Sequence, residues 1–210
     1  MDLSNKAFPY YTFKTDVLLA GIPVQVNRIG FTAELGYEIV AEVKDAQALF
    51  GAVRQAAEDF GVAGCGAAAL MMCRIEAGMV MAEVEYDHTK TPFECRLGWS
   101  VDFDKGEFLG RDALTKAKDE STGRVVTIRL DGDADGLDGA TIVADGRVVG
   151  QVTMAVPSPA LDGATIAMAR LMRDVAQVGF VLAVEAESGV RTAEVLRTPV
   201  YDPERIRVRS

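Results

Sequence analysis

The chain has 210 residues, of which 49% are hydrophobic and 25% charged, an ordinary balance for a globular protein of one large or two small domains. Its net charge of −9, without a clustered Lys/Arg stripe, argues against binding to nucleic acid or to an anionic membrane surface. Three cysteines without C-x-x-C spacing and a single histidine argue against a disulfide framework and a zinc site. The sequence shows no signal peptide and no run of about 18 apolar residues, so we expect a cytoplasmic protein.

The first half of the chain combines β-type runs with apolar residues at helical spacing. The predicted elements, in order, are a strand-turn-strand over Val17–Val26, a strand over Tyr37–Val43, a helix over residues 46–60, a helix over Gly66–Ala77, a loop over Glu83–Thr91, a strand over Leu97–Phe103 and a helix over Arg111–Asp119. Asp45 is expected to cap the first helix and Gly61 to end it. The second helix is apolar on most sides and is therefore expected to be buried.

The second half consists of short β-type runs that begin after a polar stretch, Asp119–Gly123, which we interpret as a domain boundary. The predicted strands are Arg124–Leu130, Thr141–Ala144, Arg147–Thr153, Thr165–Leu171, Gly179–Glu187 and Arg191–Leu196. Asp145-Gly146 and Ser188-Gly189 are expected to form two-residue hairpin turns. The pattern predicts an α+β protein whose second part is a small antiparallel barrel or sandwich.

Residues 27–38 carry the most specific pattern, in which Gly30 and Gly36 bracket a turn and Glu38 follows Tyr37. The segment reads G-F-T-x-E-x-G-Y-E and resembles the pterin-recognition segment of the glycine-cleavage T-protein (aminomethyltransferase) family. Segments similar to other family motifs follow in order: Arg74-Ile75-Glu76-Ala77-Gly78, Thr91-Pro92-Phe93-Glu94 with Leu97-Gly98-Trp99, Phe108-Leu109-Gly110-Arg111-Asp112-Ala113-Leu114, Gly150-Gln151-Val152-Thr153 with Ser158-Pro159, and Pro199-Val200-Tyr201-Asp202-Pro203. The resemblance implies a partial folate-binding α/β domain over residues 1–120 and a C-terminal β-barrel domain over residues 121–210.

The resemblance also implies a tetrahydrofolate cofactor and three residues that bind it. Glu38 stands where the family's glutamate accepts the paired N–H groups of the pterin, which a carboxylate can do in a bidentate, charge-assisted way. Phe31 matches an aromatic residue that packs against the folate, and Trp99 matches one that lines the folate cleft. Without the resemblance, Glu38 is equally well a solvated acid at a strand start, Phe31 a core residue and Trp99 a core or rim residue.

Other polar residues are expected to be structural or solvated. Arg74 and Glu76 are expected to form a structural ion pair, and His88 to lie on the surface. The acidic segment Asp131–Asp138 resembles a calcium loop only superficially, because Ile142 stands at the twelfth position, where such a loop needs a glutamate. We therefore predict no metal site.

Two departures from the family bear on activity. The family's helix reads A-R-D-x-L-R-x-E-A-G, and Leu70 stands in the place of its first arginine, which contributes to the folate or substrate site. The aspartate that exchanges protons around the folate lies, in the family, upstream of the segment matching Val17–Glu38, so no catalytic residue is assigned here. We expect the missing wall of the site to come from a separate N-terminal-half subunit or from a homodimer. Its absence is expected to expose apolar surface near Phe8, Tyr10, Tyr11 and Phe13.

Three functions follow as hypotheses. The first is tetrahydrofolate-dependent aminomethyl or methyl transfer, including a branch in which a folate-dependent demethylase takes a methyl group from an N-, O- or S-methyl donor. The second is a non-catalytic subunit or truncated relic that lacks the N-terminal catalytic part of such an enzyme. The third, which the ordered motifs disfavour, is an unrelated small-molecule binding protein with a barrel domain.

Overall fold

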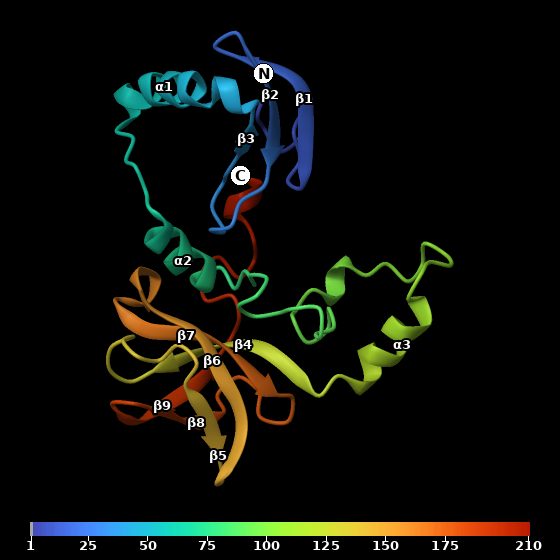
Figure 1. The fold of residues 1–210 in the computed structure, drawn as a ribbon, viewed down its shortest axis with the longest axis vertical. Helices are drawn as coiled ribbons and strands as arrows, with labels where there is room; N and C mark the ends of the chain where they lie inside the picture. The colour runs from blue at the N-terminus through green and yellow to red at the C-terminus, as the bar shows by residue number, and fades with distance from the viewer. Residues whose placement is uncertain (1) are drawn as a thin grey trace. The chain divides into compact units, whose positions relative to one another are not determined.

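The computed structural model describes residues 2–210 (Figure 1). The chain divides into two compact units, one made of residues 2–70 together with Glu204–Ser210 and the other of Met71–Pro203. The expected boundary at Asp119–Gly123 lies inside the second unit, between a helix and the first barrel strand.

The first unit contains a three-stranded antiparallel sheet and one helix. Its elements are β1 (Thr12–Leu19), β2 (Ile22–Arg28), β3 (Glu38–Val40) and α1 (Ala46–Ala57), with the strands in the order β1-β2-β3. Phe8, Val24, Val26 and Leu49 form its core, so α1 packs on the sheet through Leu49. The predicted strand-turn-strand is confirmed, whereas the strand predicted over Tyr37–Val43 shortens to β3.

Of the two residues predicted to begin and end α1, only the one at the C-terminal end acts as expected. Gly61 adopts the left-handed conformation, with φ of +68°, and ends the helical stretch as expected. Asp45 makes no side-chain capping hydrogen bond, because it is the last residue of a 3₁₀ turn, Val43–Asp45, that leads directly into the helix.

The second unit contains a closed six-stranded antiparallel barrel, which confirms the predicted α+β class. The barrel strands are β4 (Gly123–Leu130), β5 (Thr141–Ala144), β6 (Arg147–Ser158), β7 (Ala164–Met172), β8 (Val181–Ala186) and β9 (Gly189–Leu196), closed in the order β4-β7-β6-β5-β8-β9. Alternate residues point inward and form one apolar core that includes Ile128, Ile142 and Val184. Helix α3 (Arg111–Glu120) precedes the barrel, and the segment that carries it lies beside the barrel in Figure 1.

Turn chemistry accounts for the barrel hairpins. Asp145 and Gly146 both have positive φ, the conformation of a type I′ turn, and join β5 to β6 as expected. The turn between β8 and β9 is shifted by one residue from the prediction, because Ala186 pairs with Gly189 and leaves Glu187 and Ser188 in the turn.

Two elements differ from their predictions. Leu97–Phe103 is not a strand, because the N–H groups of Ser100 and Val101 donate to Leu97 and Gly98 within a 3₁₀ turn. Helix α2 (Ala67–Glu76) crosses the division between the units and is buried only at its C-terminal end, where Ile75 packs on the outer face of the barrel. Among the helices of residues 2–210, none has the length and apolar character needed to cross a membrane.

Candidate functional site

The turn between β2 and β3 places Glu38 at the first position of β3, opposite Asn27 on β2. The turn folds tightly on itself, since a Cβ atom at Gly36 would lie 3.2 Å from the backbone oxygen of Ile29. Ala33, inside the turn, is fully buried. The close approach accounts for Gly36, whereas a Cβ atom at Gly30 would make only ordinary contacts, 3.7 Å or more from its neighbours.

The carboxylate of Glu38 is available for a ligand. The side chain is exposed, and in the part of the chain that the structure describes it has neither a hydrogen-bond nor a salt-bridge partner. Glu34, in the same turn, already has a protein partner, because both of its carboxylate oxygens accept a hydrogen bond from the Nε of Arg207, at 2.8 and 2.9 Å. Of the two acids in the motif, Glu38 is therefore the one that can accept two N–H groups of a ligand.

The aromatic residues around this turn have different roles. Phe31 is half-buried in the turn. The hydroxyl of Tyr37 donates to the backbone oxygen of Leu3 at 3.2 Å, and its ring contacts Phe8 with centroids 6.0 Å apart. The contacts of Tyr37 therefore hold the backbone directly before Glu38 in place. Part of the Phe31 ring stays accessible.

Trp99, the third predicted site residue, belongs to the second unit and is not a core residue. Its side chain is 68% exposed on the 3₁₀ turn Gly98–Ser100. A Cβ atom at Gly98 would lie 2.9 Å from the ring of Phe93, so this close contact fixes the backbone that presents Trp99. The indole lines a hollow of about 520 Å³ whose other walls include Lys118 and Arg173.

Helix α2 carries the departure from the family pattern. Leu70 is exposed and lies in the first unit, with Met71 following it as the first residue of the second. An exposed leucine offers apolar surface and no donor at the position where the family carries an arginine.

The pairing expected between Arg74 and Glu76 is wrong, although both residues are structural. Arg74 pairs with Glu85, with 2.7 Å between Nη1 and Oε2, and neither side chain is exposed. Glu76 accepts from the hydroxyl of Ser158 at 2.6 Å and from the N–H of Ala160 at 2.9 Å. Glu85 takes the place expected for Glu76, because the loop after α2 brings Glu85 back to Arg74, whereas the side chain of Glu76 lies at the end of β6.

Within residues 2–210, His88, Cys95 and Asp133 lie in environments that do not suit catalysis. His88 is exposed, and hydrogen bonds from Thr89 lower the pKa of the neighbouring Asp87. Burial raises the pKa of Cys95 to about 11, which keeps its thiol protonated and unreactive near neutral pH. Asp133 pairs with Arg191 at 3.1 Å, and over residues 2–210 no group of three or more acidic, His or Cys side chains is arranged to hold a metal ion.

Comparison with known proteins assigns the chain to a family. Residues 1–105 match the model of the GCVT N-terminal domain, and residues 124–202 match that of the glycine cleavage T-protein C-terminal barrel domain. The chain belongs to the glycine-cleavage T-protein family. The resemblance seen in the ordered motifs is thereby confirmed.

Individual relatives show how much of the family protein the chain represents. It is 36% identical over 201 residues to the trimethylamine-oxide aldolase of Ruegeria pomeroyi, covering 90% of this chain and 25% of that protein. It is 33% identical over 199 residues to the aminomethyltransferase of Thermotoga petrophila, covering 94% of this chain and 54% of that protein. The chain thus spans about half the length, or less, of these relatives.

A solved structure agrees on the fold. The glycine cleavage system aminomethyltransferase T from Bartonella henselae superposes with a TM-score of 0.77 and 24% sequence identity, over 86% of this chain and 50% of that one. At this identity the comparison supports the fold alone.

Proposed function

We propose that this chain forms part of a tetrahydrofolate site for one-carbon transfer, in which Glu38 holds the pterin. The observation that carries the proposal is the exposed Glu38 carboxylate, presented by a tight turn and bonded to nothing else within residues 2–210. The pterin offers a ring N–H beside an amino group, which matches the two oxygens of one carboxylate. The family of the chain supports this assignment.

Phe31 and Trp99 are proposed to supply the apolar walls against which the folate packs. Both rings have accessible surface, since Phe31 is only partly buried and Trp99 is 68% exposed. A flat pterin or aminobenzoyl group gains from contact with an exposed ring face, because both surfaces are removed from water.

The first unit also exposes much apolar surface for a folded domain. Tyr11 and Phe13 are exposed as expected, and Phe60 is 86% exposed. Tyr10 is only partly exposed, and the expectation for Phe8 is wrong because Phe8 is a core residue. Large exposed apolar surface marks a site of interaction with another protein, a ligand or a membrane. We propose that the covering part corresponds to the remainder of the longer relatives, supplied by further polypeptide, by an N-terminal-half subunit or by a second copy of this chain.

The group transferred is proposed to be an aminomethyl or methyl group, with the reaction in the cytoplasm. The chain's own residues bind and orient the folate in this proposal, and the proton transfer is left to the covering polypeptide. Leu70 favours a donor with an apolar portion, such as the methylated substrate of a demethylase, because it replaces a cation with apolar surface. A chain that binds folate without taking part in transfer is the second candidate, and the same leucine is the observation that favours it.

Isothermal titration with tetrahydrofolate tests the proposal. Glu38→Gln replaces one of the two acceptor oxygens and removes the charge, and we expect it to weaken binding by about tenfold or more. Glu58→Gln, at an exposed acid of the same unit, is the matched control and is expected to bind as the unaltered chain does. Equal affinities of the Glu38 and Glu58 variants would refute the assignment of Glu38 to the site. The absence of binding by all three proteins would refute the assignment of tetrahydrofolate as the ligand.

A further inference from the structure

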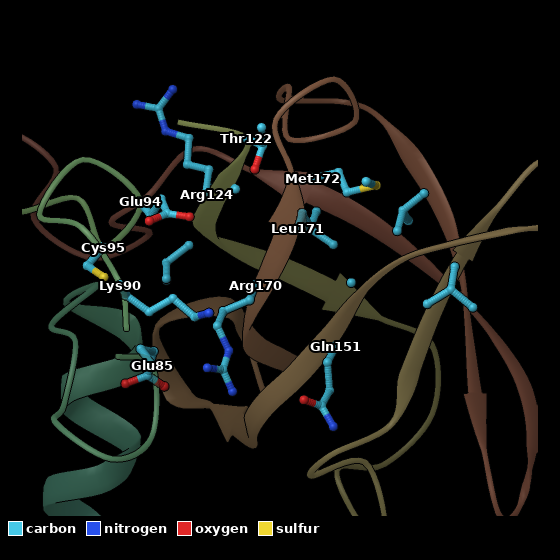
Figure 2. Close-up of a pocket in the computed structure, with 15 residues that line it drawn as sticks. Glu85, Lys90, Glu94, Cys95, Thr122, Arg124, Gln151, Arg170, Leu171 and Met172 are labelled. Carbon is cyan, nitrogen blue, oxygen red and sulfur yellow. The ribbon is translucent and has the colours of Figure 1, made fainter. Parts of the chain in front are cut away.

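A second cavity lies on the outer face of the barrel, entirely within the second unit (Figure 2). Its volume is about 530 Å³, and its walls come from β4, β6, β7 and the loop that contains residues 85–95. Val148 and Met172 line it and are exposed, so part of its surface is apolar. A cavity of this size is typical of small-molecule sites, which usually measure about 300–1,000 Å³.

Cationic side chains from three separate segments line the cavity. In Figure 2, Lys90 from the loop extends toward Arg170 from β7, while the guanidinium of Arg124 on β4 points outward at the rim. None of these three side chains forms a salt bridge with any residue of the described chain, 2–210. Among the described residues, Lys90 and Arg170 are therefore two neighbouring cations that no carboxylate contacts directly, and Asp87 acts on Lys90 only at longer range.

The cavity lining contains two carboxylates against these three cations, so the acids offset the positive charge only in part. Glu85 is fully buried, and Arg74 already compensates its charge at 2.7 Å. Glu94 is the other carboxylate of the lining, and its Oε2 accepts from the N–H and the hydroxyl of Thr91, both at 2.9 Å. The cavity is thus positive on balance in a chain whose net charge is −9, and a local field of this sign attracts anions.

The lining provides for binding and offers no nucleophile. Cys95 is its one thiol, and burial raises the pKa of that thiol to about 11, with the charge of Glu94 acting in the same direction. A protonated thiol does not attack a bound ligand at neutral pH. Arginine, in contrast, binds carboxylate and phosphate oxygens in a bidentate way, and lysine adds a point charge.

We propose that this cavity binds a small organic anion, with a carboxylate or phosphate headgroup held between Lys90 and Arg170 and a short apolar body against Val148 and Met172. No residue of the Glu38 turn lines the cavity, and although Arg124 also lines the hollow beside Trp99, Lys90 and Arg170 do not, so the proposal does not depend on folate binding. Arg124 contributes long-range attraction at the rim and little direct contact.

Isothermal titration of the full chain at constant ionic strength tests the site, with glutarate as the carboxylate probe and glycerol 3-phosphate as the phosphate probe. We expect saturable binding of at least one probe, and the preferred probe identifies the headgroup. Arg170→Gln and Lys90→Gln are each expected to weaken that binding by about tenfold or more, and Arg124→Gln by less. Arg129→Gln is the control, because Arg129 is an exposed arginine of the same barrel outside the cavity.

Two results would overturn the proposal. One is the absence of saturable binding of either probe at millimolar concentration. The other is binding that Arg170→Gln and Lys90→Gln leave unchanged, or that Arg129→Gln weakens as much. Because the Lys90 side chain is exposed, Lys90→Gln keeps the test valid if circular dichroism shows that Arg170→Gln perturbs the fold.

Discussion

Replacement of Arg74 by Met is expected to destabilise the second unit strongly, because it leaves the carboxylate of Glu85 buried without its counter-ion. Neither side chain of the pair is exposed, and 2.7 Å separates Nη1 from Oε2. Removing one partner of a buried ion pair costs about 3–5 kcal/mol. Glu85 would keep two donors, the N–H of Met81 and the hydroxyl of Thr153, both at 2.8 Å. We therefore expect a loss near the lower limit, about 3 kcal/mol in the free energy of unfolding.

Urea denaturation followed by far-ultraviolet circular dichroism measures this loss. Tryptophan fluorescence is a poor probe here, because Trp99 is already exposed in the folded protein. The matched control is Arg147→Met, which breaks an ion pair with Asp174 of similar length, 2.6 Å, whose side chains are 52% and 58% exposed. Exposed pairs contribute about 0–1 kcal/mol, so this control is expected to lose less than about 1 kcal/mol.

The double variant Arg74→Met with Glu85→Gln removes the buried charge as well as its partner. We expect it to be more stable than the sum of the single losses implies, with a coupling energy of about 1–3 kcal/mol. The reasoning would be refuted if Arg74→Met cost no more than Arg147→Met, or if the two changes at the buried pair were additive.

Two further predictions concern the barrel and its thiol. Gly150→Ala places a Cβ atom in steric conflict with the backbone oxygen of Arg170, so we expect a loss of about 2 kcal/mol or more in the free energy of unfolding, measured by urea denaturation. Gly51→Ala is the control, because Gly51 lies in open space on α1, and an equal response of both variants would contradict the packing argument. Cys95, with its pKa raised to about 11, should react with iodoacetamide at pH 8 far more slowly than the exposed Cys65, as mass spectrometry can measure. Because the pKa of Cys95 is raised from 9.0, the protonated thiol contributes to stability below pH 9, and this contribution is lost as the pH rises toward 11. The labelling rate of Cys95 should likewise keep rising up to about pH 11, and a plateau near pH 9 would disprove the shift.

The barrel strands were predictable because alternation and turn chemistry act locally. Ile128, Ile142 and Val184 belong to short alternating runs, and Asp145-Gly146 suits a type I′ turn by backbone preference alone. Leu97–Phe103 has the same local character but has no strand partner, since its N–H groups are used in a 3₁₀ turn. Strand formation depends on a neighbour that composition does not reveal.

The site residues likewise fall into those that a local sequence motif predicts and those that only the tertiary fold brings together. Glu38 was predictable because its motif is continuous in the sequence and the turn is local. Glu85 was not, since its partnership with Arg74 depends on how the loop after α2 returns to that helix. Lys90 and Arg170 are far apart in the sequence, and only the fold of the second unit brings them to one cavity. No spacing rule in the sequence would have joined them.

The most direct test of the folate proposal compares the affinity for tetrahydrofolate with that for its 2-desamino analogue, in the unaltered chain and in Glu38→Gln. If Glu38 accepts the pterin amino group, the unaltered chain should prefer tetrahydrofolate by about 1.5–3 kcal/mol, roughly 10- to 150-fold in affinity. The preference should largely disappear in Glu38→Gln. A preference of the same size in both proteins, or none in the unaltered chain, would contradict the proposal that Glu38 holds the pterin.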